Sequence, residues 1–185
     1  MKPEETLQMV LAGLEEVGID YMVTGSFASN LHGMPRTTQD ADIVIEVSPT
    51  ALDRFLNLVE DDFYVSRDAA YEALEFQRMF NVIHFGSGFK VDLIVRKNRE
   101  YARQEFQRRE RATFLGRQCW FASPEDTILS KLEWSKLSGS QRQFSDALGV
   151  AQVQRDRLDR GYLEHWARDL GLEEELRMLY SELNA

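Results

Sequence analysis

Two neighbouring stretches decide the fold: Val23-Thr24-Gly25-Ser26 and Arg36-Thr37-Thr38-Gln39-Asp40-Ala41-Asp42. A glycine-serine turn between a strand and a helix leaves backbone N–H groups pointing outward at the helix N-terminus, where phosphate oxygens bind. Asp40 and Asp42 are two positions apart, so both carboxylates project from one face if the segment is extended. Such a pair repels unless a cation neutralises it, and oxygen ligands of this kind suit Mg²⁺ or Mn²⁺.

A third acidic residue, Asp92, lies in the later apolar stretch Val91-Asp92-Leu93-Ile94-Val95. An aspartate inside an apolar strand needs a partner, because burial of an unpaired carboxylate is costly. If this strand pairs beside the strand that carries Asp40 and Asp42, the three carboxylates converge. Three carboxylates can hold two metal ions about 3.5–4 Å apart, an arrangement used for in-line displacement at phosphorus.

The rest of the chain predicts an α/β fold with a mixed sheet and a helical C-terminal third. Hydrophobic periodicity, caps and turn residues carry this prediction. We expect strands at 21–23, 42–47, 79–85 and 89–95, and a small hairpin over 113–121. We expect helices at 4–17, 26–31, after Ser48-Pro49-Thr50, from Ser123-Pro124 onward, and near 140–153, 161–169 and 172–183. A division near residue 122 separates a core, 1–122, from a helical region, 123–185, packed on it.

Composition narrows the class of protein. The chain has 185 residues and a formal charge of −9, which argues against non-specific coating of nucleic acid. Its single cysteine, Cys119, excludes an intrachain disulfide and a cysteine-based zinc site, and fits a reducing compartment. The start of the chain is polar and acidic, and no apolar run approaches the roughly 18 residues of a membrane span. We therefore expect a cytoplasmic protein with no membrane partner.

The spacing of these residues resembles the nucleotidyltransferase superfamily that includes DNA polymerase β. The resemblance rests on Gly25-Ser26, a spacer of 13 residues, Asp40-x-Asp42 and the later strand residue Asp92. The Arg36-x-Thr38-x-Asp40-x-Asp42 context is similar to a bacterial branch with AbiEii-type and MenT-type toxins, and to small bacterial nucleotidyltransferase-like proteins. The specific motif covers residues 23–46 and 90–95, and a looser similarity covers 122–150. The core at 1–122 is thereby expected to be catalytic.

The resemblance implies a role for each matched residue. Asp40, Asp42 and Asp92 would be catalytic and bind Mg²⁺ or Mn²⁺, and Asp92 would also help to deprotonate the attacking hydroxyl. Gly25 and Ser26 would hold the β- and γ-phosphates of a nucleoside triphosphate. The remaining expected nucleotide-binding residues are Arg36, Thr38, Lys131 and Asp146. In the last pair Lys131 would neutralise phosphate charge and Asp146 would orient Lys131, the base or the acceptor. Arg142 and Lys136 compete for the same roles.

The implied reaction moves a nucleoside monophosphate from a triphosphate to an acceptor hydroxyl. Two kinds of acceptor stay open. One is tRNA or protein, in a toxin-like role with a cognate antitoxin, and the other is a small molecule, as in antibiotic-modifying enzymes. A different class also stays open: a catalytically inactive module of the same fold that binds nucleotide or metal, or serves interaction. Pairing of two copies through the C-terminal helices is open as well.

The stretch from Arg96 to Arg117 is basic within an acidic chain. It holds eight basic and three acidic residues, a formal charge of +5. A helix that starts soon after Asp92 would direct Arg99 and Arg103 toward a triphosphate or an RNA backbone. The alternative is a solvated helix with salt bridges between side chains one turn apart.

Overall fold

The computed structural model describes residues 2–184, which form two compact units. The sheet unit contains the chain up to Thr24 and Thr38–Phe121. The helical unit contains Gly25–Thr37 and the chain from Ala122 onward. The segment with the glycine-serine turn therefore clusters with the C-terminal helices, although it lies between two strands in the sequence. A functional boundary at residue 122 stays a prediction.

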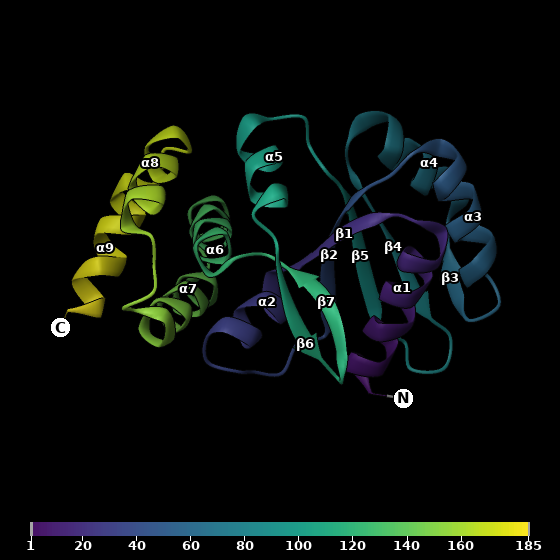
Figure 1. The fold of residues 1–185 in the computed structure, drawn as a ribbon, viewed down its shortest axis with the longest axis horizontal. Coiled ribbons are helices and arrows are strands. Elements are labelled where there is room, and N and C mark those ends of the chain that lie inside the picture. Colours follow the sequence, from purple (N-terminus) through teal and green to yellow (C-terminus); the bar gives the residue numbers. More distant parts are fainter. Residues whose placement is uncertain (1, 185) are drawn as a thin grey trace. The chain divides into compact units, whose positions relative to one another are not determined.

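The sheet unit is built on one mixed sheet of seven strands within residues 2–184, in the order β3-β4-β5-β2-β1-β7-β6 (Figure 1). The strands are β1 Asp20–Thr24, β2 Asp40–Glu46, β3 Phe63–Val65, β4 Met79–His84, β5 Lys90–Val95, β6 Glu110–Phe114 and β7 Arg117–Phe121. β2 and β5 run parallel at the centre, whereas β1 and β4 pair antiparallel to them on either side. The predicted α/β class with a mixed sheet is confirmed.

Among the described residues the sheet unit has four helices, and two of their caps follow from the sequence. The helices are α1 Pro3–Val17, α3 Pro49–Val59, α4 Arg67–Phe76 and α5 Glu100–Gln107. α1 packs against α3 and β1 (Figure 1). It ends at Gly18, which has a φ of 75°, a left-handed conformation that glycine adopts without a steric penalty. The Ser48 hydroxyl accepts a hydrogen bond from the Ala51 N–H and caps α3 as expected.

The helical unit contains α2 Gly25–His32, α6 Pro124–Ser138, α7 Gln141–Gln154, α8 Arg160–Asp169 and α9 Glu173–Leu183. α6 packs on α7, and α2 contacts both. The Ser123 hydroxyl caps α6 and also bonds the buried Asp126 carboxylate at 2.6 Å. Asp126 in turn accepts a hydrogen bond from the Tyr162 hydroxyl on α8 at 2.7 Å. The predicted Ser-Pro helix start is therefore present, and it also joins two helices of this unit.

Gly33, just after α2, lies so close to α7 that a side chain does not fit. A Cβ there would stand 2.7 Å from the backbone nitrogen of Val150 and 2.9 Å from the backbone carbon of Gly149. Because helix backbone cannot move aside cheaply, Gly33→Ala is expected to lower the free energy of unfolding by about 1–3 kcal/mol. Urea unfolding followed by circular dichroism measures this. Gly161→Ala, whose nearest neighbour is a side-chain atom at 3.4 Å, is the control and should change little.

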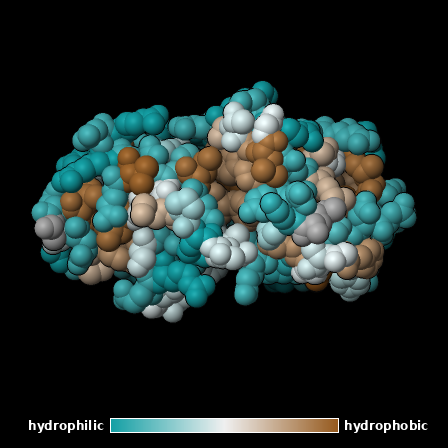
Figure 2. Space-filling model, turned by 90° about the horizontal axis from the view of Figure 1, so that it is seen from below, coloured by the Kyte–Doolittle hydropathy of each residue, from teal (hydrophilic) through white to brown (hydrophobic). Residues whose placement is uncertain are grey.

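Two elements differ from the sequence prediction. β3 and α4 were not expected, because β3 has three residues and α4 buries only Ala70 and Ala73 on its apolar side. The side chains of Trp134 and Leu137 on α6 are mostly exposed. On the face in Figure 2 the apolar residues form separate brown patches among teal polar ones.

Within residues 2–184, none of the helices combines the length and apolar character of a membrane span.

Candidate active site

A row of polar side chains crosses four strands of an otherwise apolar sheet. The register aligns Thr24 on β1 with Asp42 on β2, Asp42 with Asp92 on β5, and Asp92 with Asn81 on β4. Residues directly opposite each other on paired strands project from the same face. Their neighbours in sequence, such as Ala41, Ile43, Val91 and Leu93, are buried on the other face. The row is therefore a polar patch on one face, held by strands whose opposite face builds the core.

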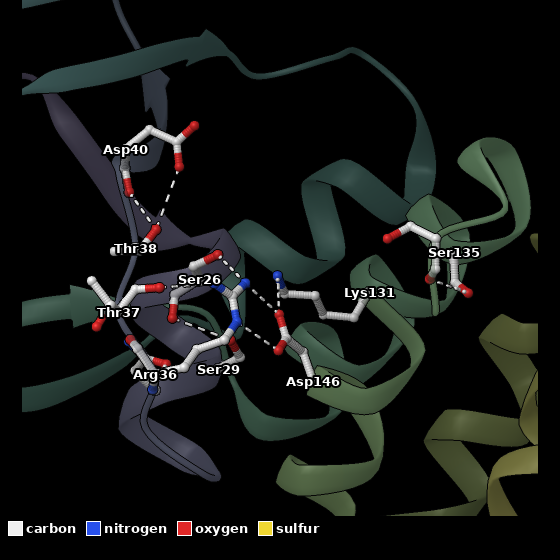
Figure 3. A network of polar contacts seen from close by, with 11 residues as sticks. Ser26, Ser29, Arg36, Thr37, Thr38, Asp40, Lys131, Ser135 and Asp146 are labelled. Carbon is white, nitrogen blue, oxygen red and sulfur yellow. Dashed lines mark hydrogen bonds and ion pairs between the residues drawn. The ribbon is translucent and has the colours of Figure 1, made fainter. Parts of the chain in front are cut away.

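Asp40 and Lys90 form a second row one step along the same two central strands. They are register partners and lie on the same face as Asp42 and Asp92, because each is two positions from its acidic neighbour. The Thr38 hydroxyl donates a hydrogen bond to the Asp40 backbone oxygen at 3.0 Å and lies 3.4 Å from Oδ1 of the same residue (Figure 3). Thr38 thus holds the start of β2 and the carboxylate of Asp40.

The ammonium of Lys90 lies between two of the three carboxylates. Its Nζ donates to Asp92 Oδ2 at 2.7 Å and lies 3.9 Å from Asp40 Oδ2. The hydrogen bond to Asp92, helped by the negative charges of Asp92, Asp40 and Asp42, outweighs burial and raises the pKa of Lys90. The side chain is therefore charged at neutral pH, and it neutralises part of the acidic patch.

Asp92 is the most buried member of this patch and is incompletely satisfied. Its side chain is 5% exposed. Oδ2 accepts from Lys90, whereas Oδ1 has no hydrogen-bond partner within residues 2–184. A buried carboxylate oxygen without a partner is costly, so this atom marks a place for a ligand that carries positive charge or a proton.

The donor set fits a hard divalent cation. Asp40, Asp42 and Asp92 supply only oxygen ligands, as Mg²⁺ and Mn²⁺ prefer, and Asp92 Oδ1 is available. Within residues 2–184, however, no three acidic, histidine or cysteine side chains stand close enough together to form a finished metal cage. The expected convergence of the three carboxylates is thus present as a shared face, with Lys90 among them.

In the helical unit, the glycine-serine turn opens α2. Gly25 has a φ of 60°, which a side chain would strain, and it starts the helix directly after β1. The Ser26 hydroxyl accepts a hydrogen bond from Nη2 of Arg36 at 2.9 Å. Asn30 holds the Arg36 backbone on both sides, with its amide donating to the carbonyl at 2.7 Å and accepting from the N–H at 3.0 Å. The Arg36 guanidinium is thereby fixed beside the first turn of α2.

Asp146 on α7 joins two cations of the helical unit (Figure 3). Arg36 donates to it through Nε at 2.9 Å and Nη2 at 2.8 Å, a two-pronged pair. Lys131 Nζ lies 2.9 Å from Asp146 Oδ2 on the other side. Lys131 and Asp146 are only 4% and 8% exposed, against 28% for Arg36. Burial by itself raises the pKa of Asp146, but hydrogen bonds from Arg36 and Lys131 outweigh burial and lower it.

The fold of this chain is similar to the folds of several solved structures. The chain resembles an antigenic nucleotidyltransferase-like protein from Paracoccidioides brasiliensis, at a TM-score of 0.62 and 17% identity over 99% of this chain and 92% of that chain. It also resembles ANT(2'')-Ia in complex with adenylyl-2''-tobramycin, at a TM-score of 0.59 and 14% identity over 96% and 98%. The chain has the nucleotidyltransferase fold.

A third structure with this nucleotidyltransferase fold is the lincosamide antibiotic adenylyltransferase LnuA bound to lincomycin. Its TM-score is 0.58 at 11% identity, over 80% of this chain and 96% of that chain. No protein-family model and no curated protein matches the sequence. The predicted nucleotidyltransferase fold is confirmed, whereas the AbiEii and MenT branch stays a prediction.

Within the nucleotidyltransferase fold, the predicted residues fall into one group in each unit. The sheet unit holds Thr38, Asp40, Asp42 and Asp92, and the helical unit holds Gly25, Ser26, Arg36, Lys131 and Asp146. The expected partnership of Asp146 with Lys131 is present as a buried ion pair. The competing candidates lie elsewhere: Lys136 donates to the Gly171 carbonyl and pairs with Glu175, and Arg142 is exposed. The catalytic and nucleotide-binding roles stay predictions.

Sequence reasoning missed Lys90 and Asn81 as members of the patch. Lys90 was available from the same two-residue period that linked Asp40 to Asp42, since it precedes Asp92 by two positions. Asn81 carried no such signal, because its place opposite Asp92 follows from the register of β4 against β5. A hairpin was expected there, but its register was not.

The basic stretch after β5 is largely engaged inside the sheet unit. Ion pairs join Arg96 to Glu46 at 3.0 Å, Arg109 to Asp20 at 3.2 Å and Arg117 to Glu15 at 2.9 Å. Arg109 also stacks on the rings of Phe106 and Trp120. Arg103 donates to the side chain of Asn98. These ion pairs join residues far apart in the sequence, so they are neither the expected salt bridges one turn apart on a helix nor contacts directed at a phosphate.

Proposed function

We propose that this protein is a metal-dependent nucleotidyltransferase that moves a nucleoside monophosphate from a nucleoside triphosphate to an acceptor hydroxyl. The observation that carries the proposal is the polar patch of Asp40, Asp42 and Asp92, with one buried oxygen of Asp92 left without a partner. The nucleotidyltransferase fold supports it.

The carboxylates of Asp40, Asp42 and Asp92 would hold Mg²⁺ or Mn²⁺. When bound, such ions screen the charge of the phosphates and stabilise the charge that spreads over them in the transition state. Thr38 positions Asp40 through its hydroxyl. Asp92 Oδ1, which accepts no hydrogen bond within residues 2–184, would take the proton of the attacking hydroxyl.

Phosphate recognition would fall to the helical unit. The backbone N–H groups at the start of α2, after Gly25, carry the positive end of the helix dipole. The Arg36 guanidinium beside Ser26 adds a fixed positive charge suited to phosphate oxygens. Lys131 adds a second cation, which Asp146 holds in place. We assign the β- and γ-phosphates of the triphosphate to this group.

The reaction breaks one phosphorus–oxygen bond and forms another. The acceptor oxygen attacks the α-phosphorus in line with the leaving pyrophosphate, and the acceptor loses its hydroxyl proton. No residue of the protein is modified, so the chemistry depends on position and charge.

We propose a small-molecule hydroxyl as the acceptor. LnuA is bound to lincomycin and ANT(2'')-Ia to adenylyl-2''-tobramycin, and both share the fold along most of their own length. The internal pairing of the basic stretch leaves less positive charge for an extended RNA backbone. A tRNA or protein acceptor, in a toxin-like role, would be the outcome that replaces this choice.

A label-transfer assay tests the proposal. The protein is incubated with Mg²⁺ or Mn²⁺, each α-labelled nucleoside triphosphate in turn, and separate acceptors: an aminoglycoside and lincosamide panel, bulk tRNA and total protein. We expect label on a small molecule, release of pyrophosphate, and loss of both signals when EDTA removes the metal. Triphosphate binding without transfer to any acceptor would instead identify a non-catalytic module of this fold.

A further inference from the structure

The structure places the ammonium of Lys90 inside the acidic patch of the sheet unit. Asp92 has two carboxylate oxygens, of which Oδ2 receives Nζ of Lys90 at 2.7 Å and Oδ1 receives nothing within residues 2–184. The same ammonium is 3.9 Å from Asp40 Oδ2. A divalent cation that used these oxygens would meet Lys90 at the atoms it needs.

Lys90 lowers the negative charge that a metal ion would meet in the acidic patch. Three carboxylates carry a formal charge of −3, and Lys90 reduces it to −2, which one divalent cation cancels. Two like charges near one carboxylate repel, so the ammonium opposes any cation that enters the patch. Its side chain is 37% exposed and ends a flexible four-carbon stem, so it can turn away into solvent.

We propose that Lys90 is a built-in counter-cation of the acidic patch, one that a divalent metal ion must displace from Asp92. The inference rests on the metal site of the proposed function. With Lys90 in place, the patch keeps its carboxylates together without metal, and it binds metal weakly. The patch would then bind a metal ion tightly only when a nucleoside triphosphate adds its own negative charge.

Binding of Mn²⁺ alone, without nucleotide or acceptor, tests this proposal by the loss of the free-ion signal in electron paramagnetic resonance. Lys90→Met keeps the apolar stem and removes the charge, and we expect it to bind Mn²⁺ at least about tenfold more tightly than the unmodified protein. Lys90→Arg, which keeps the charge, should stay within about threefold. Lys97→Met is the matched control, because Lys97 is an exposed lysine just beyond the same strand, and it should leave affinity unchanged.

A second readout uses thermal unfolding. In EDTA, Lys90→Met should melt below the unmodified protein, because the buried Asp92 carboxylate has lost its ion-pair partner. Added Mn²⁺ should raise the melting temperature of Lys90→Met more than that of the unmodified protein. If the unmodified protein bound Mn²⁺ and Lys90→Met bound it equally or more weakly, the role of Lys90 would be overturned, but the metal site would not. No Mn²⁺ binding by any variant at millimolar concentration would overturn the metal site, and with it both proposals.

Discussion

Asp42→Asn is expected to reduce nucleotidyl transfer at least about a hundred- to a thousandfold. Asp42 lies at the centre of the polar row, opposite Thr24 on one side and Asp92 on the other. Asparagine has nearly the same size and removes one negative charge, so the patch would retain its shape and lose affinity for a divalent cation. The label-transfer assay at saturating Mg²⁺ measures the loss, and Mn²⁺ binding shows whether metal affinity falls with it.

Glu46→Gln is the matched control for this variant. Glu46 ends the same strand, four positions from Asp42 and therefore on the same face. It is exposed and pairs with Arg96 at 3.0 Å, a surface ion pair that contributes little to stability. Transfer should stay within about twofold. If folded Asp42→Asn kept a tenth or more of the unmodified rate, the acidic patch would not be the catalytic centre.

The acidic patch was predictable from sequence because strand geometry has a period of two. Asp40 and Asp42 share a face wherever their segment is extended, and Asp92 stands out as a charge between buried Val91 and Leu93. What the pattern left open was the order of the strands. The parallel pairing of β2 with β5, which aligns Asp42 with Asp92, joins residues 50 positions apart through two other strands and two helices.

The arrangement of side chains in the helical unit was less predictable from the sequence. Lys131 and Asp146 lie on two different helices, and Arg36 lies 110 residues before Asp146. Helical periodicity shows which residues face a core, but not which cations meet which carboxylate when helices pack. The placement of Gly25–Thr37 with the C-terminal helices was hidden for the same reason, since its contacts with α6 and α7 depend on packing at sites such as Gly33.

Asp146→Asn is expected to lower the free energy of unfolding by about 3–5 kcal/mol. The change removes the carboxylate that Lys131 and Arg36 share, and the Lys131 side chain is only 4% exposed, so its charge would stay buried without a partner carboxylate. Such a loss would lower the melting temperature by roughly 6–20 °C for a chain of this size. Urea unfolding at pH 7 gives the difference, and Asp156→Asn, at an exposed aspartate in the turn after α7, should change stability by less than about 0.5 kcal/mol.

The pH dependence of this difference separates a charge effect from a packing effect. Because the folded protein lowers the pKa of Asp146, its ion pairs stabilise the fold above the unfolded value of about 3.9, and that stabilisation is lost as pH falls through the lowered folded value. The gap between the unmodified protein and Asp146→Asn should therefore be full at pH 7 and close below pH 4. Lys131→Met should also cost less in the Asp146→Asn background than alone, because the shared interaction is already gone. A gap that stayed constant down to pH 3, or additive costs in the double variant, would show that Asp146 stabilises the helical unit by shape alone.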